Sequence, residues 1–258
     1  MKKSALVLVA SLGASLVPTF AFADDAASPL TFNIGAVSDY RYRGLTQTKF
    51  EPALQGGADY SAGPLYVGTW LSTIEWVKDT GKIAGADSGD APLEWDLYGG
   101  IKGDVIKDSL TYDVGVLAYV YVGEKFHNIG LSNPDTGEFY GALTYGVFTG
   151  KVSISATPLF GVPKSKGSQY YDLSANFDIG SGFTLTPHAG YQNVTGSYSK
   201  ANNISYSDYS LTLGKDFGKG LSASLQVIAT DADKIWYATS GGKFTGRTGV
   251  VAGVKYSF

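Results

Sequence analysis

The chain has 258 residues, a formal net charge of −3, no cysteine and only two histidines. The lack of cysteine excludes disulfide bonds, thiol catalysis and cysteine-based metal sites. The weak, mixed charge provides no basic surface for nucleic acid. Glycine, with 34 residues, and tyrosine, with 18, are abundant. We therefore expect a protein held together by backbone hydrogen bonds and packing, with no nucleic-acid partner.

The first 23 residues have the three parts of a secretory signal peptide. Two lysines follow the first methionine, an apolar run covers residues 5–17, and Ala-Phe-Ala at residues 21–23 precedes two aspartates. The apolar run is shorter than a membrane-spanning helix requires. We predict cleavage after Ala23, which assigns residues 1–23 to a signal peptide and residues 24–258 to one exported domain.

From residue 30 onward, apolar and polar side chains alternate with a period of two, and no convincing helical period is found. This alternation is typical of strands with one apolar face. Each run has about the length, roughly 9 to 11 residues, that a tilted strand needs to cross a bilayer. We place Tyr40 and Tyr42 of the first run, and Tyr66, Trp70 and Trp76 of the third, on the apolar, outward face. Twelve strands are predicted, at residues 30–42, 53–60, 65–77, 93–102, 110–122, 139–149, 151–160, 170–179, 183–192, 206–217, 221–230 and 247–258.

The connections between these strands alternate between short and long. A soluble sandwich of two sheets would also show alternating faces, but it does not require this alternation of connections. Membrane barrels have short periplasmic turns and longer extracellular loops. We therefore predict an all-β domain, a single transmembrane antiparallel up-and-down β-barrel of twelve strands. The turns are expected at residues 61–64, 103–109, 150, 180–182 and 218–220, and the outward loops at 43–52, 78–92, 123–138, 161–169, 193–205 and 231–246.

The last predicted strand places Val250, Val254, Tyr256 and Phe258 on its apolar face. Its ending on Phe258 resembles the sorting signal of bacterial outer-membrane barrel proteins. The resemblance implies that the protein lies in the bacterial outer membrane, surrounded by outer-membrane lipid. It also implies that the barrel-assembly machinery recognises the protein through this strand.

Three stretches near the start of the predicted barrel carry a family resemblance. They are Ser-Asp-Tyr-Arg-Tyr-Arg-Gly-Leu-Thr-Gln-Thr at residues 38–48, Pro-Ala-Leu-Gln-Gly-Gly-Ala-Asp-Tyr at residues 52–60 and Leu-Tyr-Val-Gly-Thr-Trp-Leu-Ser at residues 65–72. Glu94 and Asp96 also fit the pattern. The exported part of the chain is similar to the TorF family of porins, also known as the Gcw_chp domain of proteobacteria. This resemblance implies an outer-membrane barrel with a porin role, and it indicates no particular substrate.

The polar faces of the predicted strands carry the candidate site, because they line the lumen. Charged rings in a lumen set the selectivity of ion pores, although any barrel also fills its interior with paired polar side chains. We predict a basic wall of Arg41, Arg43 and Arg247, and an acidic wall of Glu75, Glu94 and Asp96. The predicted pore-lining residues are Asp39, Arg41, Arg43, Glu75, Glu94, Asp96, Asp113, Asp172, His188, Asp208, Arg247 and Lys255.

These features predict a porin-like passive channel for small solutes or ions, with no enzymatic activity, catalytic residue, metal or cofactor. Two alternatives stay open. Bulky side chains such as Tyr119, Tyr121 and Tyr140 would close the lumen and make the barrel a surface receptor or anchor. A hydrolase would need a histidine at the outer rim, whereas His188 is expected inside and His127 in a solvated loop. No long loop is predicted to fold into the barrel.

Overall fold

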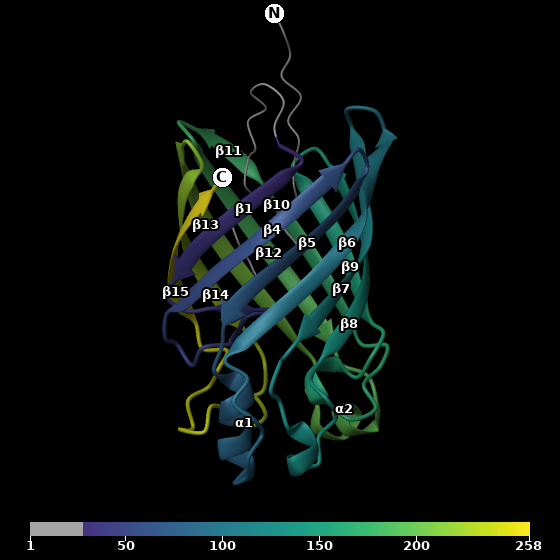
Figure 1. Ribbon diagram of the computed structural model, residues 1–258, viewed down its shortest axis with the longest axis vertical. Coiled ribbons are helices and arrows are strands. Elements are labelled where there is room, and N and C mark those ends of the chain that lie inside the picture. Colours follow the sequence, from purple (N-terminus) through teal and green to yellow (C-terminus); the bar gives the residue numbers. More distant parts are fainter. Residues whose placement is uncertain (1–27) are drawn as a thin grey trace, which may run out of the picture.

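The computed structural model describes residues 28–258, and the predicted signal peptide lies outside these residues. One antiparallel sheet closes into a barrel of tilted strands (Figure 1). The wall strands are β1 (Leu30–Val37), β4 (Ala53–Ala62), β5 (Leu65–Thr73), β6 (Leu93–Ile106), β7 (Leu110–Val120), β8 (Thr136–Tyr145), β9 (Phe148–Ser155), β10 (Gln169–Ala175), β11 (Phe177–Gly180), β12 (Phe183–Asn193), β13 (Tyr206–Gly218), β14 (Leu221–Thr230) and β15 (Gly249–Ser257). The shorter elements are β2 (Arg41–Tyr42), β3 (Leu45–Thr46), the helices α1 (Trp76–Ala84) and α2 (Ser197–Asn202), and the 3-10 helices η1 (Phe126–Ile129) and η2 (Leu159–Gly161).

Two strand pairings close the barrel: β1 pairs with β15, and β10 pairs with β12. β10 and β11 are two parts of one strand that is interrupted at Asn176, whose backbone N–H still donates to the carbonyl of Val147 on the neighbouring turn. Counted in this way, residues 28–258 form twelve wall strands, and the predicted up-and-down barrel is confirmed. Closure gives every wall strand a partner on both sides, which is what a sheet in hydrocarbon requires.

The outer face of the barrel is mostly apolar. On β15, Val250 is 61 % exposed and Val254 is 49 % exposed, whereas Val251 between them is 7 % exposed. Leu211 on β13 and Leu225 on β14 lie on the same outer face. A continuous band of exposed apolar side chains around a closed cylinder is the surface of a membrane-spanning barrel.

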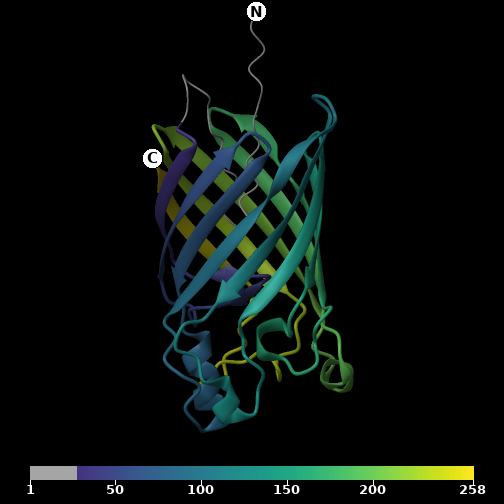
Figure 2. The same ribbon diagram turned by 45° about the vertical axis from the view of Figure 1, so that its right-hand side comes forward.

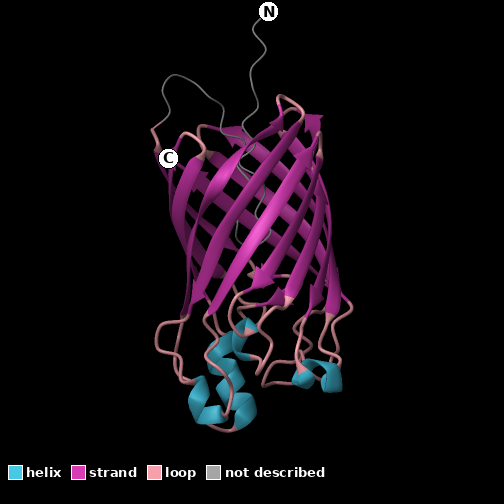
Figure 3. Ribbon diagram, turned by 90° about the vertical axis from the view of Figure 1, so that its right-hand side faces the viewer, coloured by secondary structure: helices cyan, strands magenta, loops and turns pink. Residues whose placement is uncertain are grey.

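The two ends of the barrel differ (Figure 3). The C-terminus and the short turns lie at one end, which we name the turn end. The long connections, with α1 and α2, lie at the other end, which we name the loop end. The predicted alternation of short and long connections is thus present. None of the helices in residues 28–258 is long and apolar enough to cross a membrane.

The prediction for the third strand is wrong in both extent and facing. β5 ends at Thr73, and Trp76 begins α1 instead of continuing the strand. Trp70 is 6 % exposed and Tyr66 is hydrogen-bonded inside the barrel, whereas Val67 lies outside. Aromatic rings suit a lipid interface, but on this strand aliphatic side chains take the lipid side. The rings fit inside because neighbouring strands place glycines against them.

Several other limits also differ from the prediction. The first strand ends at Val37 and not at residue 42, because the chain then turns into the barrel. The turn predicted at Gly150 lies at Gly146, whose φ of 59° falls in the left-handed region that favours glycine. Pro158, predicted within a strand, instead precedes η2, so no wall strand has to accommodate it.

We expect Leu225→Arg to destabilise the barrel by about 2–4 kcal/mol, because it places a charge in the middle of the lipid-facing band. Ser224, the next residue on β14, faces the lumen side, between Gly214 and Gly253. The matched variant Ser224→Arg should therefore lose much less stability. Urea unfolding from lipid vesicles measures both variants, and equal losses would contradict this assignment of faces.

Candidate functional site

Residues 38–52, between β1 and β4, fold into the loop end of the barrel, and we name them the inward segment. Its strands β2 and β3 form a hairpin that turns at Arg43 and Gly44, both with positive φ. Figure 2 shows this dark purple stretch crossing the lower part of the barrel interior. The predictions of an outward loop here, and of Tyr40 and Tyr42 facing lipid, are therefore wrong. Side chains of the segment that are at most 8 % exposed are Asp39, Tyr40, Arg41, Arg43, Thr46 and Thr48.

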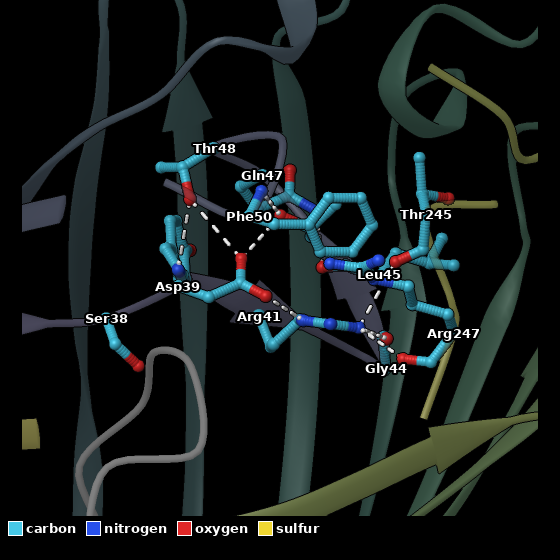
Figure 4. Close-up of polar contacts among 12 residues, drawn as sticks. Ser38, Asp39, Arg41, Gly44, Leu45, Gln47, Thr48, Phe50, Thr245 and Arg247 are labelled. Atoms are coloured by element: carbon cyan, nitrogen blue, oxygen red, sulfur yellow. Dashed lines mark hydrogen bonds and ion pairs between the residues drawn. The ribbon is translucent and has the colours of Figure 1, made fainter. Parts of the chain in front are cut away.

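Asp39 holds the inward segment together from within (Figure 4). Its carboxylate accepts from Arg41 Nε at 2.5 Å, from Thr46 Oγ1 at 2.5 Å and from Thr48 Oγ1 at 3.3 Å. Thr48 Oγ1 in turn accepts from the backbone N–H of Tyr40 at 3.2 Å. The charge of Asp39 is therefore compensated within the segment itself, which lowers the free energy of burying it.

Arg41 joins the inward segment to the residues before β15. Its Nη1 donates to the carbonyls of Gly44, Thr245 and Arg247 at 3.1 to 3.2 Å. The guanidinium groups of Arg41 and Arg247 both lie against the ring of Phe50, at 5.1 and 3.9 Å from its centroid (Figure 4). The structure thus brings together two of the three arginines of the predicted basic wall, but Arg41 is already ion-paired with Asp39.

Arg43 reaches the opposite side of the barrel. Its Nη2 donates to both oxygens of Glu138 on β8, at 2.9 and 2.7 Å, and its Nη1 donates to Gln192 Oε1 on β12 at 2.6 Å. The guanidinium also lies 4.2 Å from the ring centroid of Tyr170 on β10. A two-point carboxylate contact fixes both position and orientation. The inward segment is therefore attached to three strands that are distant from it in sequence.

Sequence reasoning missed Glu138 and Gln192. Glu138 is predicted to lie in the loop at 123–138, but β8 begins at Thr136 and includes it. The signal that would have found it is its even spacing from Tyr140, which places both side chains on the inner face. Gln192 lies on the inner face of a correctly predicted strand, but no local pattern indicates its distant partner Arg43.

A third attachment of the inward segment is to α1 and the loop before β15, at the loop end and beyond the wall strands. Lys49 Nζ is 2.5 Å from Asp79 Oδ1 on α1, and Asp79 Oδ2 accepts from the backbone N–H of Ser240 at 2.8 Å. Burial opposes ionisation of Asp79, but the donors Lys49 and Ser240 outweigh it and lower the pKa of this carboxyl. The contact joins the inward segment, α1 and the loop before β15.

Most lumen carboxylates accept a hydrogen bond from a tyrosine. Tyr66 donates to Asp113 at 2.6 Å, and Tyr98 donates to Asp59 at 2.6 Å. A tyrosine hydroxyl is a neutral donor, so it satisfies the carboxylate without cancelling its charge. The remaining pairs are Tyr40 and Tyr121 with Glu94, Tyr119 with Glu138, and Tyr170 with Asp208.

Glycines on neighbouring strands make room for these rings. A Cβ at Gly68 would collide with the ring of Tyr98, and a Cβ at Gly100 would collide with that of Tyr66. The same relation links Gly115 to Tyr140 and Gly190 to Tyr170. Each ring therefore lies flat across the bare backbone of the next strand and does not project freely into the lumen.

The wall of the lumen is asymmetric. β5 to β8 contribute the aromatic side chains Tyr66, Trp70, Tyr98, Tyr119 and Tyr140. The opposite strands contribute mainly hydroxyl groups, at Ser153, Thr184, Thr186, Ser210, Thr212, Ser222 and Ser224. We name the side with these seven small hydroxyl side chains the hydroxyl wall, although Tyr170, His188 and Tyr206 lie on the same strands.

His188, on β12, is held by carboxylates. Its Nε2 lies 2.8 Å from Asp172 Oδ2, and its Nδ1 lies 3.6 Å from Asp208 Oδ1. Both ring nitrogens face carboxylates, and Nε2 also lies 3.3 Å from the hydroxyl of Tyr170, which donates to Asp208 at 2.9 Å. His127 is exposed on η1. Within residues 28–258, no group of three or more His, Cys, Asp or Glu side chains is arranged to hold a metal ion.

The other predicted pore-lining residues lie at different depths. Glu75 is exposed just before α1, so it is not part of the predicted acidic wall. Glu94 and Asp96 lie on the inner face of β6, buried to 2 and 1 % exposure. Asp113 lies nearer the turn end, and Lys255 lies opposite Gly35 and Ser222. The acidic wall therefore keeps two of its three members.

Sequence comparison places the chain in a family. A family model described as "Bacterial protein of unknown function (Gcw_chp)" matches residues 23–258. The predicted resemblance to the Gcw_chp pattern is thereby confirmed. No curated protein sequence matches the chain.

Solved porin structures have a similar fold. The KdgM porin superposes with a TM-score of 0.53 at 7 % sequence identity, covering 88 % of this chain and 99 % of that one. The NanC porin gives a TM-score of 0.51 at 11 % identity, covering 89 % and 98 %. A second KdgM structure, described as in complex with disordered oligogalacturonate, gives 0.52 at 6 % identity, covering 89 % and 98 %. At these identities the likeness concerns the fold.

We expect Arg43→Met to destabilise the protein by about 3–5 kcal/mol, because it leaves Glu138 buried without its cation. Glu138→Gln should also lower the free energy of unfolding, because it leaves the guanidinium of Arg43 buried without its anion. The double variant should lose less than the two single losses combined, by about 1–3 kcal/mol, since it removes both charges together. Unfolding free energies of the three variants complete the cycle, and strictly additive losses would show that the pair is not coupled.

Proposed function

We propose a function for this chain, which belongs to the Gcw_chp family of bacterial proteins: it is a passive, porin-like channel of the bacterial outer membrane that passes small cations and small uncharged solutes. The closed barrel, its apolar outer band and the similar folds of two porins support the location and the channel class. The charge of the lumen supports the preference for cations.

The pairing of lumen carboxylates with tyrosines carries this proposal. Asp59, Glu94 and Asp113 are hydrogen-bonded by neutral hydroxyl groups, which leave their negative charges in place. Asp208 also accepts from a tyrosine, but it faces His188 as well. In a narrow, low-dielectric passage such charges raise the local concentration of cations. The proposed channel therefore selects by the sign of the solute's charge.

The cations of the lumen do not cancel this charge. Arg41 and Arg43 are ion-paired with Asp39 and Glu138. The lysines that face the lumen are Lys102, Lys151 and Lys255, and the first two lie over the rings of Tyr66 and Tyr140. Five other lumen carboxylates, Asp59, Glu94, Asp113, Asp172 and Asp208, outnumber these three lysines, and His188 lies between the last two. A solved KdgM porin is described in complex with oligogalacturonate, which is a polyanion. The acid-rich lumen of this chain instead suits solutes of positive charge.

The proposed constriction lies at the loop end, between the inward segment and the hydroxyl wall. The segment fills the side next to the aromatic wall, where Tyr40, Trp70 and Tyr119 are buried. Solutes would pass along the serine and threonine side chains of β12 to β14. Such a passage is polar, and its wall also carries the larger side chains His188, Gln192 and Tyr206.

We also propose partners for the outer surface. Lipid would surround the apolar band, and the barrel-assembly machinery would recognise the last strand. In support of this, Phe258 is 65 % exposed, and its ring stacks on Phe32 and Tyr256 at 5.8 and 5.7 Å. Its backbone exchanges hydrogen bonds with Phe32 across the β1–β15 seam, so the C-terminal aromatic group lies at the junction that closes the barrel.

A closed barrel that presents its loops as a receptor or anchor is the second candidate. The observation that favours it is the tight packing at the loop end, where Tyr40, Tyr121 and Phe126 are at most 2 % exposed. Single-channel recording separates the candidates. Stable current steps support the channel, and silence of a correctly folded, inserted protein supports the closed barrel.

We expect the protein in planar bilayers under a potassium chloride gradient to give a reversal potential of a cation-selective channel. Asp113→Asn should lower the cation-to-anion permeability ratio about two- to threefold, because it removes a charge that acts on the lumen. Asp87→Asn is the matched control, since Asp87 is exposed at the loop end and paired with Lys125 at 2.9 Å. An unchanged ratio in Asp113→Asn would refute the role of the lumen carboxylates.

A further inference from the structure

Asp96 differs from the other lumen carboxylates. It is 1 % exposed on β6, and neither of its carboxylate oxygens has a hydrogen-bond partner in the described part of the chain. Glu94, two residues away on the same face, accepts from the hydroxyls of Tyr40 and Tyr121. Buried carboxylates are normally paired or hydrogen-bonded, so the unpartnered Asp96 requires an explanation.

The tyrosine donors around Asp96 are bound to other groups. Tyr119, directly opposite on β7, is hydrogen-bonded to Tyr42 at 2.7 Å and faces Glu138, and Tyr98 donates to Asp59. The titratable and charged groups around Asp96 are Glu94 and Tyr98 on β6, Tyr119 and Tyr121 on β7, Glu138 on β8, and Tyr40, Tyr42 and Arg43 of the inward segment.

An ionised Asp96 would be strongly unfavourable in this position. Its nearest charged neighbours, Glu94 and Glu138, carry the same sign, and Arg43 already contacts both oxygens of Glu138. Both oxygens of Asp96 are sealed from water, so no space for a hydrated ion adjoins them. A proton neutralises the carboxylate without needing space.

The inward segment makes this seal. Tyr40 lies edge-on against Trp70, with ring centroids 5.5 Å apart, and Trp70 is directly opposite Asp96 on β5. Tyr42 covers Tyr119, the opposite neighbour on β7, in the same edge-on manner at 5.5 Å. Two tyrosines of one segment therefore cover the residues on both sides of Asp96. Withdrawal of the segment would open Asp96 to lumen water, where a carboxylate ionises.

We propose that Asp96 is a proton-binding site that controls the inward segment: the segment stays docked while Asp96 carries a proton and leaves its docked position when that proton is lost. The docked state binds the proton more tightly than the undocked state, so acid favours docking and rising pH favours release. This inference deepens the proposed function and rests on it for one consequence, that release widens the loop end of the channel.

The other attachments of the segment do not reproduce this dependence. The lowered pKa of Asp79 keeps this carboxyl ionised except in strong acid. Its ion pair with Lys49 therefore does not change over the pH range in which Asp96 is proposed to lose its proton. Arg43 keeps its charge at every accessible pH. Tyr40 of the segment also donates to Glu94, a second buried carboxylate. The pH response is assigned to Asp96 and not to Glu94, because Glu94 is hydrogen-bonded by two tyrosines and Asp96 has no partner.

Cysteine labelling tests the proposal without requiring conduction. The protein contains no cysteine, so Thr46→Cys, at a segment position 4 % exposed, supplies a single thiol. Its maleimide modification rate is divided, at each pH, by that of Lys219→Cys in an exposed turn, which removes the effect of thiol ionisation. Between about pH 4 and about pH 9, the range over which buried carboxyls titrate, we expect the ratio to rise at least about tenfold.

Neutral substitutions at Asp96 should abolish the rise. Thr46→Cys combined with Asp96→Asn, or with Asp96→Leu in case the amide disturbs folding, should give a ratio independent of pH. Asp178→Asn, an exposed carboxylate at the turn end, is the matched control and should keep the rise. A rise that persists in both Asp96 variants, or a flat ratio in the parent protein, would overturn the proposal.

A disulfide tether links the segment to conduction. A Cβ built on Gly44 lies 3.1 Å from Thr230 Cβ, somewhat short of the range of about 3.5–4.5 Å in disulfides. It also lies 2.8 Å from Asp208 Cβ, and Gly44 has a positive φ, so Gly44→Cys alone is the control for strain. The oxidised Gly44→Cys, Thr230→Cys pair should lose the pH-dependent rise in conductance, reduction should restore it, and the single cysteines serve as controls. If no current flows while the labelling ratio still depends on pH, the proposed channel function is refuted and the proposed proton-binding site at Asp96 stands. If current flows while the labelling ratio does not depend on pH, the proposed channel function stands and the proposed proton-binding site at Asp96 is refuted.

Discussion

A closed barrel in hydrocarbon has only one compartment for its polar side chains, and that is the lumen. In this protein the outer positions are apolar, so carboxylates, lysines and arginines gather in a narrow interior. Each buried carboxylate then needs a donor within that small volume. Tyrosine supplies most of these donors, and a neutral donor leaves the charge in place. The interaction that satisfies the buried carboxylates is therefore also the one on which the proposed preference for cations rests.

The composition of the chain follows from the same arrangement. A tyrosine that faces the lumen needs both an acceptor for its hydroxyl and room for its ring, and glycine on the next strand provides the room. Tyr66 over Gly100 and Tyr140 over Gly115 show this arrangement along the aromatic wall. The packing of rings against glycines inside the barrel therefore accounts for part of the abundance of glycine and tyrosine.

The sequence alone predicts the wall strands well because hydrocarbon enforces a period of two, and β14 matches its predicted limits. It fails where an aromatic residue fits either side, as with Trp70, because rings suit lipid and lumen alike. The sequence did not predict that the inward segment folds into the barrel, for a related reason. Asp39, Tyr40 and Arg41 continue the alternation of β1, and the contacts that draw them inside, such as Arg43 with Glu138, join residues far apart in the chain.

The inward segment can enter the lumen because it carries its own counter-charge. Asp39 and Arg41 neutralise each other within the hairpin, so these two charges need no partner from the wall. Arg43 is the exception, and it engages Glu138, which the wall would otherwise leave unpaired. Asp96 receives no such partner, although the segment covers it. Docking therefore satisfies one wall carboxylate and isolates another, and this imbalance ties the position of the segment to the charge of a single side chain.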